Sequence, residues 1–141
     1  MLTHLIIAAH SDAEAICLNW PQAQKWPGLQ MAGLNTGLFP ALAMAWNDKS
    51  QAERLGADAL VVTMAGQQGP WVFHLPDDFR DRLAALTPDE FPTLAQAWAQ
   101  EEELQDFGWT AVDLEALLAK LQEFASRASR ERKSLLLWMC F

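Results

Sequence analysis

The chain of 141 residues contains no tyrosine, only two cysteines and only five serines. Basic residues are also scarce: ten lysines and arginines stand against eighteen acidic residues, a formal net charge of -8 at pH 7. Phosphate binding needs clustered basic side chains, so this balance argues against nucleic-acid binding. The cysteines, Cys17 and Cys140, have no zinc-site or redox spacing, and we expect thiols in the reducing cytoplasm.

Long apolar runs and nucleophile motifs are absent as well. No apolar stretch approaches the roughly 18 to 20 residues that span a bilayer, so we expect no membrane association. The apolar run at residues 2–9 has no basic residue before it and acidic residues directly after it, which argues against a signal peptide. There is no G-x-S-x-G, S-x-x-K or Walker lysine motif, and no cofactor or metal is predicted.

Hydrophobic residues make up 51% of the chain, close to the average of globular proteins. The length suits one domain spanning residues 1–141. Continuous apolar runs at 2–9 and 134–141 predict strands buried on both faces, and the segments 59–64 and 71–75 predict a hairpin around a Gly-Pro turn. Residues 20–40, dense in tryptophan, proline and glycine, predict an irregular packed loop.

Helices are expected after four capping-box patterns, in which a serine or threonine precedes a carboxylate by three residues: Ser11, Ser50, Thr87 and Thr110. The helix after Thr87 is expected to continue through Leu104 to a break at Gly108. Further helices are expected from Leu38 to Trp46 and after Pro76, and the last helix repeats leucines at three and four residues. The fold class is therefore α+β, a mostly antiparallel sheet of about four strands packed against a long C-terminal helix and shorter helices.

One candidate catalytic site combines His10 and Asp12, which follow the first predicted strand, with His74 at the end of the predicted hairpin. Two histidines and a carboxylate in one cleft suit a small hydrolase or a metal-assisted enzyme. The two histidines are sixty-four residues apart, so this hypothesis requires the fold to bring them together. The alternative is that His10 and Asp12 are structural, because the segment also starts a helix.

A second candidate site is acidic. Residues 77–115 carry eleven acidic and two basic side chains, and Glu101, Glu102 and Asp106 lie close together within this stretch. We expect an accessory or immunity-type binding protein that meets a basic protein partner through this surface. The alternative is a solvated surface that the basic residues 127–133 neutralise from the end of the last helix.

Seven tryptophans are several times the usual number for this length. Trp98, Trp109 and Trp138 lie in core-facing patterns. Trp20, Trp26 and Trp71 lie in loops or at a strand start, where they are candidate walls of an aromatic pocket. A small-molecule carrier is therefore a third functional hypothesis, and the oligomeric state is left open.

The second half of the chain resembles small uncharacterised bacterial proteins, loosely those of the YfbM-like family of unknown function. The resemblance covers roughly residues 60–141 and is carried by their layout: Gly69-Pro70-Trp71-Val72, Leu75-Pro76 before a helix, Trp98 with Glu101-Glu102, and an amphipathic helix running into Leu135-Leu136-Leu137-Trp138. It implies a bacterial cytoplasmic α+β domain and supplies no catalytic residue.

Overall fold

The computed structural model describes residues 2–22, 25–31, 37–56, 60–106 and 108–140. Its strands form one five-stranded sheet in the order β2-β1-β5-β4-β3, and every neighbouring pair is antiparallel. The strands are β1 (Leu2–Ala8), β2 (Gly28–Gln30), β3 (Val61–Met64), β4 (Trp71–Leu75) and β5 (Ser134–Cys140). The α+β class and the antiparallel sheet are confirmed. The expected strand count misses β2, because three residues within a loop-like segment show no alternation of apolar and polar side chains.

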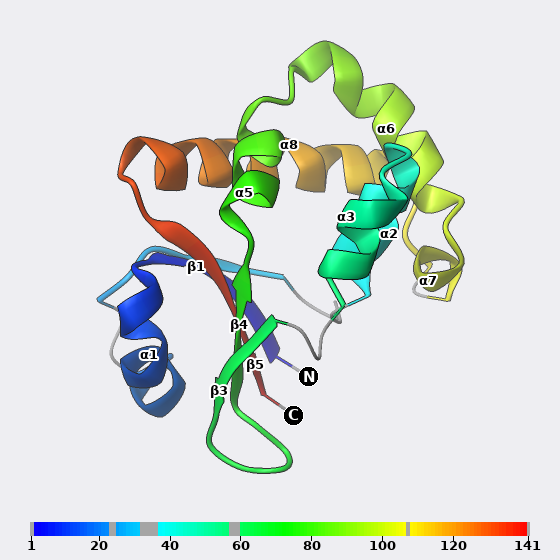
Figure 1. Cartoon of the computed structure of the whole chain (residues 1–141). Helices are drawn as coiled ribbons and strands as arrows, with labels where there is room; N and C mark the ends of the chain where they lie inside the picture. Colours follow the sequence, from blue (N-terminus) through cyan, green and yellow to red (C-terminus); the bar gives the residue numbers. More distant parts are fainter. Residues whose placement is uncertain (1, 23–24, 32–36, 57–59, 107, 141) are drawn as a thin grey trace.

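The C-terminal strand β5 occupies the middle of the sheet (Figure 1). It pairs with β1 over seven positions, from Leu2 opposite Cys140 to Ala8 opposite Ser134, and with β4 along its other edge. All residues of β5 from Ser134 to Met139 are buried. The continuous apolar runs did predict interior strands, since a strand covered on both faces needs no polar side.

Helices cover both faces of this sheet. They are α1 (Ala13–Asn19), α2 (Leu38–Ala45), α3 (Lys49–Arg54), α5 (Asp77–Ala84), α6 (Phe91–Ala99), α7 (Glu102–Gln105) and α8 (Ala111–Arg130), with short 3-10 turns at η1 (His10–Asp12) and η2 (Pro88–Glu90). The larger core joins α2, α5, α6 and α8 to one face, and the smaller core joins α1 to the other. None of the helices in the described ranges is both long and apolar enough to cross a membrane.

The long helix α8 is the predicted C-terminal helix. Its buried residues recur at three and four positions: Leu114, Leu117, Leu118, Leu121, Ala125 and Ala128. Trp98 of α6 is fully buried against it in the larger core, and its indole N–H donates to the Leu38 carbonyl at 3.1 Å. Trp138 is buried in the smaller core, and Trp109 packs partly buried against the larger one.

One of the four predicted helix caps is complete, at Thr110, and at Thr87 only the carboxylate half of the predicted pair is formed. The Thr110 hydroxyl accepts from the Asp113 backbone N–H at 3.2 Å, and the Asp113 carboxylate accepts from the Thr110 N–H at 3.1 Å. At Thr87, the backbone N–H and the hydroxyl both donate to Glu90 Oε1, at 3.1 and 3.0 Å. Both helix starts therefore lie where the pattern predicts them.

The other two predicted caps are wrong. Helix α3 begins before Ser50, and its cap is Asp48, whose carboxylate accepts from the Gln51 N–H at 3.0 Å. The first helical turn begins at His10, before Ser11, and the Asp12 carboxylate accepts from the Ala9 N–H at 3.3 Å. At α3 an aspartate, rather than the serine, accepts from an N–H of the first turn, and at η1 Asp12 accepts from the N–H of Ala9, the residue before the turn.

The helix expected to continue from Thr87 through Leu104 is instead broken. Helix α6 ends at Ala99, Glu101 has an extended backbone with ψ 140, and α7 starts at Glu102. Leu104 is buried in the core. In one continuous helix it would face about 120° away from Trp98, because successive residues rotate by about 100°. The break turns Leu104 back toward the core.

Candidate functional site

The two histidines of the candidate catalytic site meet. His74 lies on β4 and His10 in the turn η1, and their rings stack with centroids 4.4 Å apart and planes inclined by 18°. They border a cavity of about 530 Å³ that is otherwise lined by Leu60, Val61, Val62 and Pro76. The fold thus brings His10 and His74 together, as the enzyme hypothesis requires.

A hydrogen-bond chain holds the His74 ring. Its Nε2 lies 3.1 Å from Ser134 Oγ, and the Ser134 hydroxyl donates to Asp77 Oδ1 at 3.0 Å. Because a carboxylate only accepts, the serine hydrogen goes to Asp77 and its oxygen accepts from the His74 Nε2–H. Arg80 anchors the chain, lying 3.4 Å from Asp77 and donating to the Lys133 carbonyl at 2.8 Å.

Burial lowers the pKa of His74 from its ordinary value, and the neighbouring His10 and Arg80 lower it further, against the opposing effect of Asp77. The lowered pKa favours the neutral ring at pH 7, and the contact with Ser134 favours the tautomer with its proton on Nε2 and a lone pair on Nδ1. This is the state that a general base requires.

The carboxylates of this cluster make contacts within the fold. Asp12 caps the first turn, as described above, and does not line the cavity. Asp77 accepts a hydrogen bond from Ser134. In a Ser-His-Asp triad the aspartate instead accepts from the histidine ring, so this cluster is not such a triad. Lone pairs lie in the ring planes, so stacked rings do not aim them at one ion, and no group of three His, Cys, Asp or Glu side chains in the described ranges is placed to hold a metal.

Nine of the eleven acidic residues of the stretch fall into two groups, and the other two, Asp113 and Glu115, lie on α8. On α5 the carboxylates are paired with arginines: Asp78 with Arg54 at 2.8 Å, and Asp77 and Asp81 with Arg80 at 3.4 and 2.9 Å. Hydrogen bonds from Arg54 and Arg80 hold the pKa values of Asp78 and Asp81 below the ordinary range. This part of the stretch is neutralised locally.

The second part has no such partners. We call the six acidic residues that flank α6 the α6–α7 acidic surface: Asp89 and Glu90 lie in η2 before α6, and Glu101, Glu102, Glu103 and Asp106 lie beyond its other end. Among the residues that the structure describes, none of these six forms an ion pair, and all except Glu101 are exposed. Partial burial and the charge of Glu103 raise the pKa of Glu101. Arg127 pairs with Glu131 at 2.9 Å, so the alternative, in which the end of α8 neutralises this surface, does not operate through Arg127.

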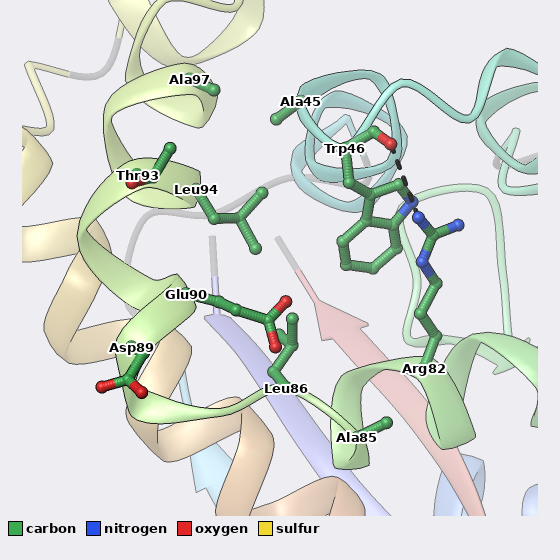
Figure 2. A pocket seen from close by; sticks show the side chains of 10 residues that line it. All are labelled: Ala45, Trp46, Arg82, Ala85, Leu86, Asp89, Glu90, Thr93, Leu94 and Ala97. Carbon is green, nitrogen blue, oxygen red and sulfur yellow. Dashed lines mark hydrogen bonds between the residues drawn. The ribbon is translucent and has the colours of Figure 1, made fainter.

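A cavity of about 490 Å³ opens beside the α6–α7 acidic surface, between the end of α2, α5, η2 and the first turns of α6 (Figure 2). It is lined by Ala45, Trp46, Arg82, Ala85, Leu86, Asp89, Glu90, Thr93, Leu94 and Ala97. In Figure 2 the Glu90 carboxylate points into the space between Leu86 and Trp46, whereas the Asp89 carboxylate points away. We call this the Trp46 cavity.

Arg82 forms one side of the Trp46 cavity, but its charge is already balanced. Its guanidinium lies over the Trp46 ring, with Cζ 4.3 Å from the centroid, and its NH1 donates to Asp48 Oδ2 at 2.8 Å. The Trp46 indole N–H in turn donates to Gln51 Oε1 at 3.2 Å. The sequence does not indicate this cavity, because Trp46 fits the apolar stripe of its helix and no local pattern places Arg82 against it.

The three tryptophans proposed as pocket walls lie elsewhere. Trp20 is buried in the smaller core, where its ring meets His4 edge-on at 5.5 Å, and Trp26 packs against the same core. Trp71 packs partly buried against the larger core. None of the three is among the residues that line the Trp46 cavity or the cavity beside His10 and His74.

No family model, curated protein or solved structure matches the chain. The resemblance to the YfbM-like family stays a prediction.

Proposed function

We propose that this protein is a cytoplasmic binding protein, of an accessory or immunity type, that meets a basic protein partner through the α6–α7 acidic surface. The observation that supports the proposal is that the six carboxylates of this surface have no cationic partner among the described residues, whereas those of α5 do. Nucleic acid is not the partner, because its phosphates carry the same sign of charge.

Unpaired charges of one sign do not stabilise the fold. They repel one another: burial is the larger cause of the raised pKa of Glu101, and the charge of Glu103 raises it further. A partner with clustered lysine and arginine side chains relieves the repulsion on binding. Charge of this kind raises the association rate and selects against acidic partners more than it adds affinity.

Co-purification at two salt concentrations tests the proposal. The tagged protein should recover a basic protein from its native cell at about 50 mM salt and lose it at about 500 mM, because exposed charges are screened more strongly at high salt. A variant with Glu102→Lys and Asp106→Lys should fail to recover it. The matched control, Glu14→Lys with Glu123→Lys, makes the same change in net charge at exposed sites on α1 and α8 and should still recover it.

If the control loses the partner to the same extent, net charge rather than this surface governs recovery, and the proposal is wrong. Recovery that does not change with salt contradicts it as well.

A second candidate function, a small hydrolase, is favoured by the neutral His74 ring stacked on His10 beside a cavity. His74 would act there as a general base, through the lone pair on Nδ1. A panel of p-nitrophenyl esters and phosphate esters tests this function. Hydrolysis that is lost in His74→Gln and retained in His4→Gln supports it, and the absence of turnover in the unmodified protein contradicts it.

A further inference from the structure

We propose that the Trp46 cavity receives one long basic side chain, a lysine or an arginine, of the protein partner. The inference rests on the proposed function and adds the anchor point of the complex. Glu90 lines the cavity before the start of α6 and Ala97 lines it near the end of α6, so a partner that contacts the acidic residues at both ends of α6 also meets the cavity.

The shape and lining of the cavity suit such a side chain. Its volume of about 490 Å³ lies within the range of ordinary ligand pockets. Leu86, Leu94 and Ala97 supply apolar contact for the aliphatic stem that lysine and arginine share. The Glu90 carboxylate, which points into the same space, lies where the cationic end would sit (Figure 2).

The charge of the cavity favours a cation over an anion. Arg82 is the cationic side chain in its lining, and Asp48 already pairs with it at 2.8 Å. Asp89 and Glu90 have no ion-pair partner among the described residues. An anionic ligand would have to compete with Asp48 for Arg82, whereas a cationic ligand finds an uncompensated carboxylate.

Glu90 is also positioned before any ligand arrives. Its Oε1 accepts from the Thr87 N–H at 3.1 Å and from the Thr87 hydroxyl at 3.0 Å, which fixes the carboxylate at the start of α6. Its Oε2 accepts no hydrogen bond from the residues that the structure describes. A preorganised acceptor of this kind binds with less loss of side-chain freedom.

An NMR titration of the full chain with N-acetylarginine amide and N-acetyllysine amide tests the inference, with the Trp46 indole N–H signal as the probe. The neutral analogue N-acetylcitrulline amide has nearly the same shape as the arginine probe but lacks its charge. We expect saturable shifts of the Trp46 signal with at least one basic probe, at dissociation constants on the order of millimolar, as suits so small a ligand. The citrulline probe should bind about tenfold more weakly.

Two variants locate the binding. Glu90→Gln removes the charge but keeps the cap, because glutamine also serves at this position of a capping box, and it should weaken binding of the basic probe several-fold. Ala97→Phe should abolish binding by filling the cavity. Gln96→Phe is its matched control, since Gln96 is exposed on α6 and does not line the cavity.

Equal shifts with the arginine and citrulline probes would overturn the inference, as would undiminished binding to Ala97→Phe. Co-purification separates this failure from that of the proposed function. If the Glu102→Lys and Asp106→Lys variant loses the partner while Ala97→Phe and Glu90→Gln retain it, recognition through the acidic surface is supported. The same result shows that the Trp46 cavity does not bind a side chain of the partner.

Discussion

The guanidinium of Arg82 lies on the face of the Trp46 indole, with Cζ 4.3 Å from the ring centroid, and donates from NH1 to Asp48 at 2.8 Å. One side chain of α5 thereby joins the end of α2 to the start of α3. The contact holds the wall of the Trp46 cavity in place. Asp48 neutralises the positive charge that Arg82 would otherwise bring to the cavity.

Replacing Arg82 with glutamine should lower the free energy of unfolding by about 1 kcal/mol, since the cation–π contact and a half-exposed ion pair are each worth a fraction of that. Urea denaturation measures the change, and Arg54→Gln, which removes a more exposed pair, is the control. Binding of N-acetylarginine amide should persist or strengthen, because the cavity becomes more negative. Loss of that binding would show that the cavity binds the probe only when the Arg82 contact holds its wall in place.

The cap of α3 gives a second prediction. Asp48→Ala should destabilise the protein by about 1 kcal/mol or more, because it removes the helix cap and leaves Arg82 unpaired. Ser50→Ala should change the free energy of unfolding by less than about 0.5 kcal/mol. Asp48→Asn, which retains a capping oxygen, should fall between the two. Equal losses in Ser50→Ala and Asp48→Ala would restore Ser50 as the cap.

The central position of β5 in the sheet gives a third prediction. Leu136 is fully buried, so Leu136→Ala should cost about 2 to 5 kcal/mol. Leu2, at the half-exposed end of β1, provides the matched comparison, and Leu2→Ala should cost less than about 1 kcal/mol. Removal of residues 138–141 should abolish the cooperative thermal transition. A truncated chain with an unchanged melting temperature would contradict this account of the sheet.

Stability should also depend on pH through the histidines. Burial lowers the pKa values of His4 and His74 below their ordinary value of 6.5, so the folded state binds protons less readily than the unfolded state. The stabilising contribution is fully present above about pH 6.5 and is lost as the pH falls toward the folded-state pKa values. Asp78 and Asp81, whose pKa values are lowered, add a further loss at more acidic pH.

Urea denaturation between about pH 5 and 7.5 measures this dependence, and His74→Gln should flatten it. His10→Gln should raise the pKa of His74 in an NMR titration, because the neighbouring His10 contributes to its lowering. A His74 pKa above 6.5 in the unmodified protein would refute the proposed neutral ring.

The sequence predicted the elements that carry a strong local signal. The apolar runs of β1 and β5 and the leucine pattern of α8 follow from burial alone. Helix caps were less predictable, because in an acidic chain a serine often precedes a carboxylate by three residues by chance. At α3 the aspartate two residues before Ser50 is the residue that meets the Gln51 N–H.

The candidate sites depended on tertiary contacts. His10 and His74 stack although they are sixty-four positions apart. The enzyme hypothesis required this contact, but the sequence could not predict it. The contact of Arg82 with Trp46 requires the relative placement of α2 and α5, which no periodicity encodes. The sequence shows that the residues of the α6–α7 acidic surface are acidic. Only the structure shows which carboxylates the nearby arginines pair with, and these are the carboxylates of α5.

The association rate with the basic partner recovered by co-purification tests the central claim most directly. At low salt, Glu102→Lys with Asp106→Lys should slow association by about tenfold or more, while the melting temperature stays nearly unchanged. Glu14→Lys with Glu123→Lys, the same change in net charge on other helices, should slow it much less. Equal slowing by the two double variants, or none by the first, would contradict recognition through the α6–α7 acidic surface.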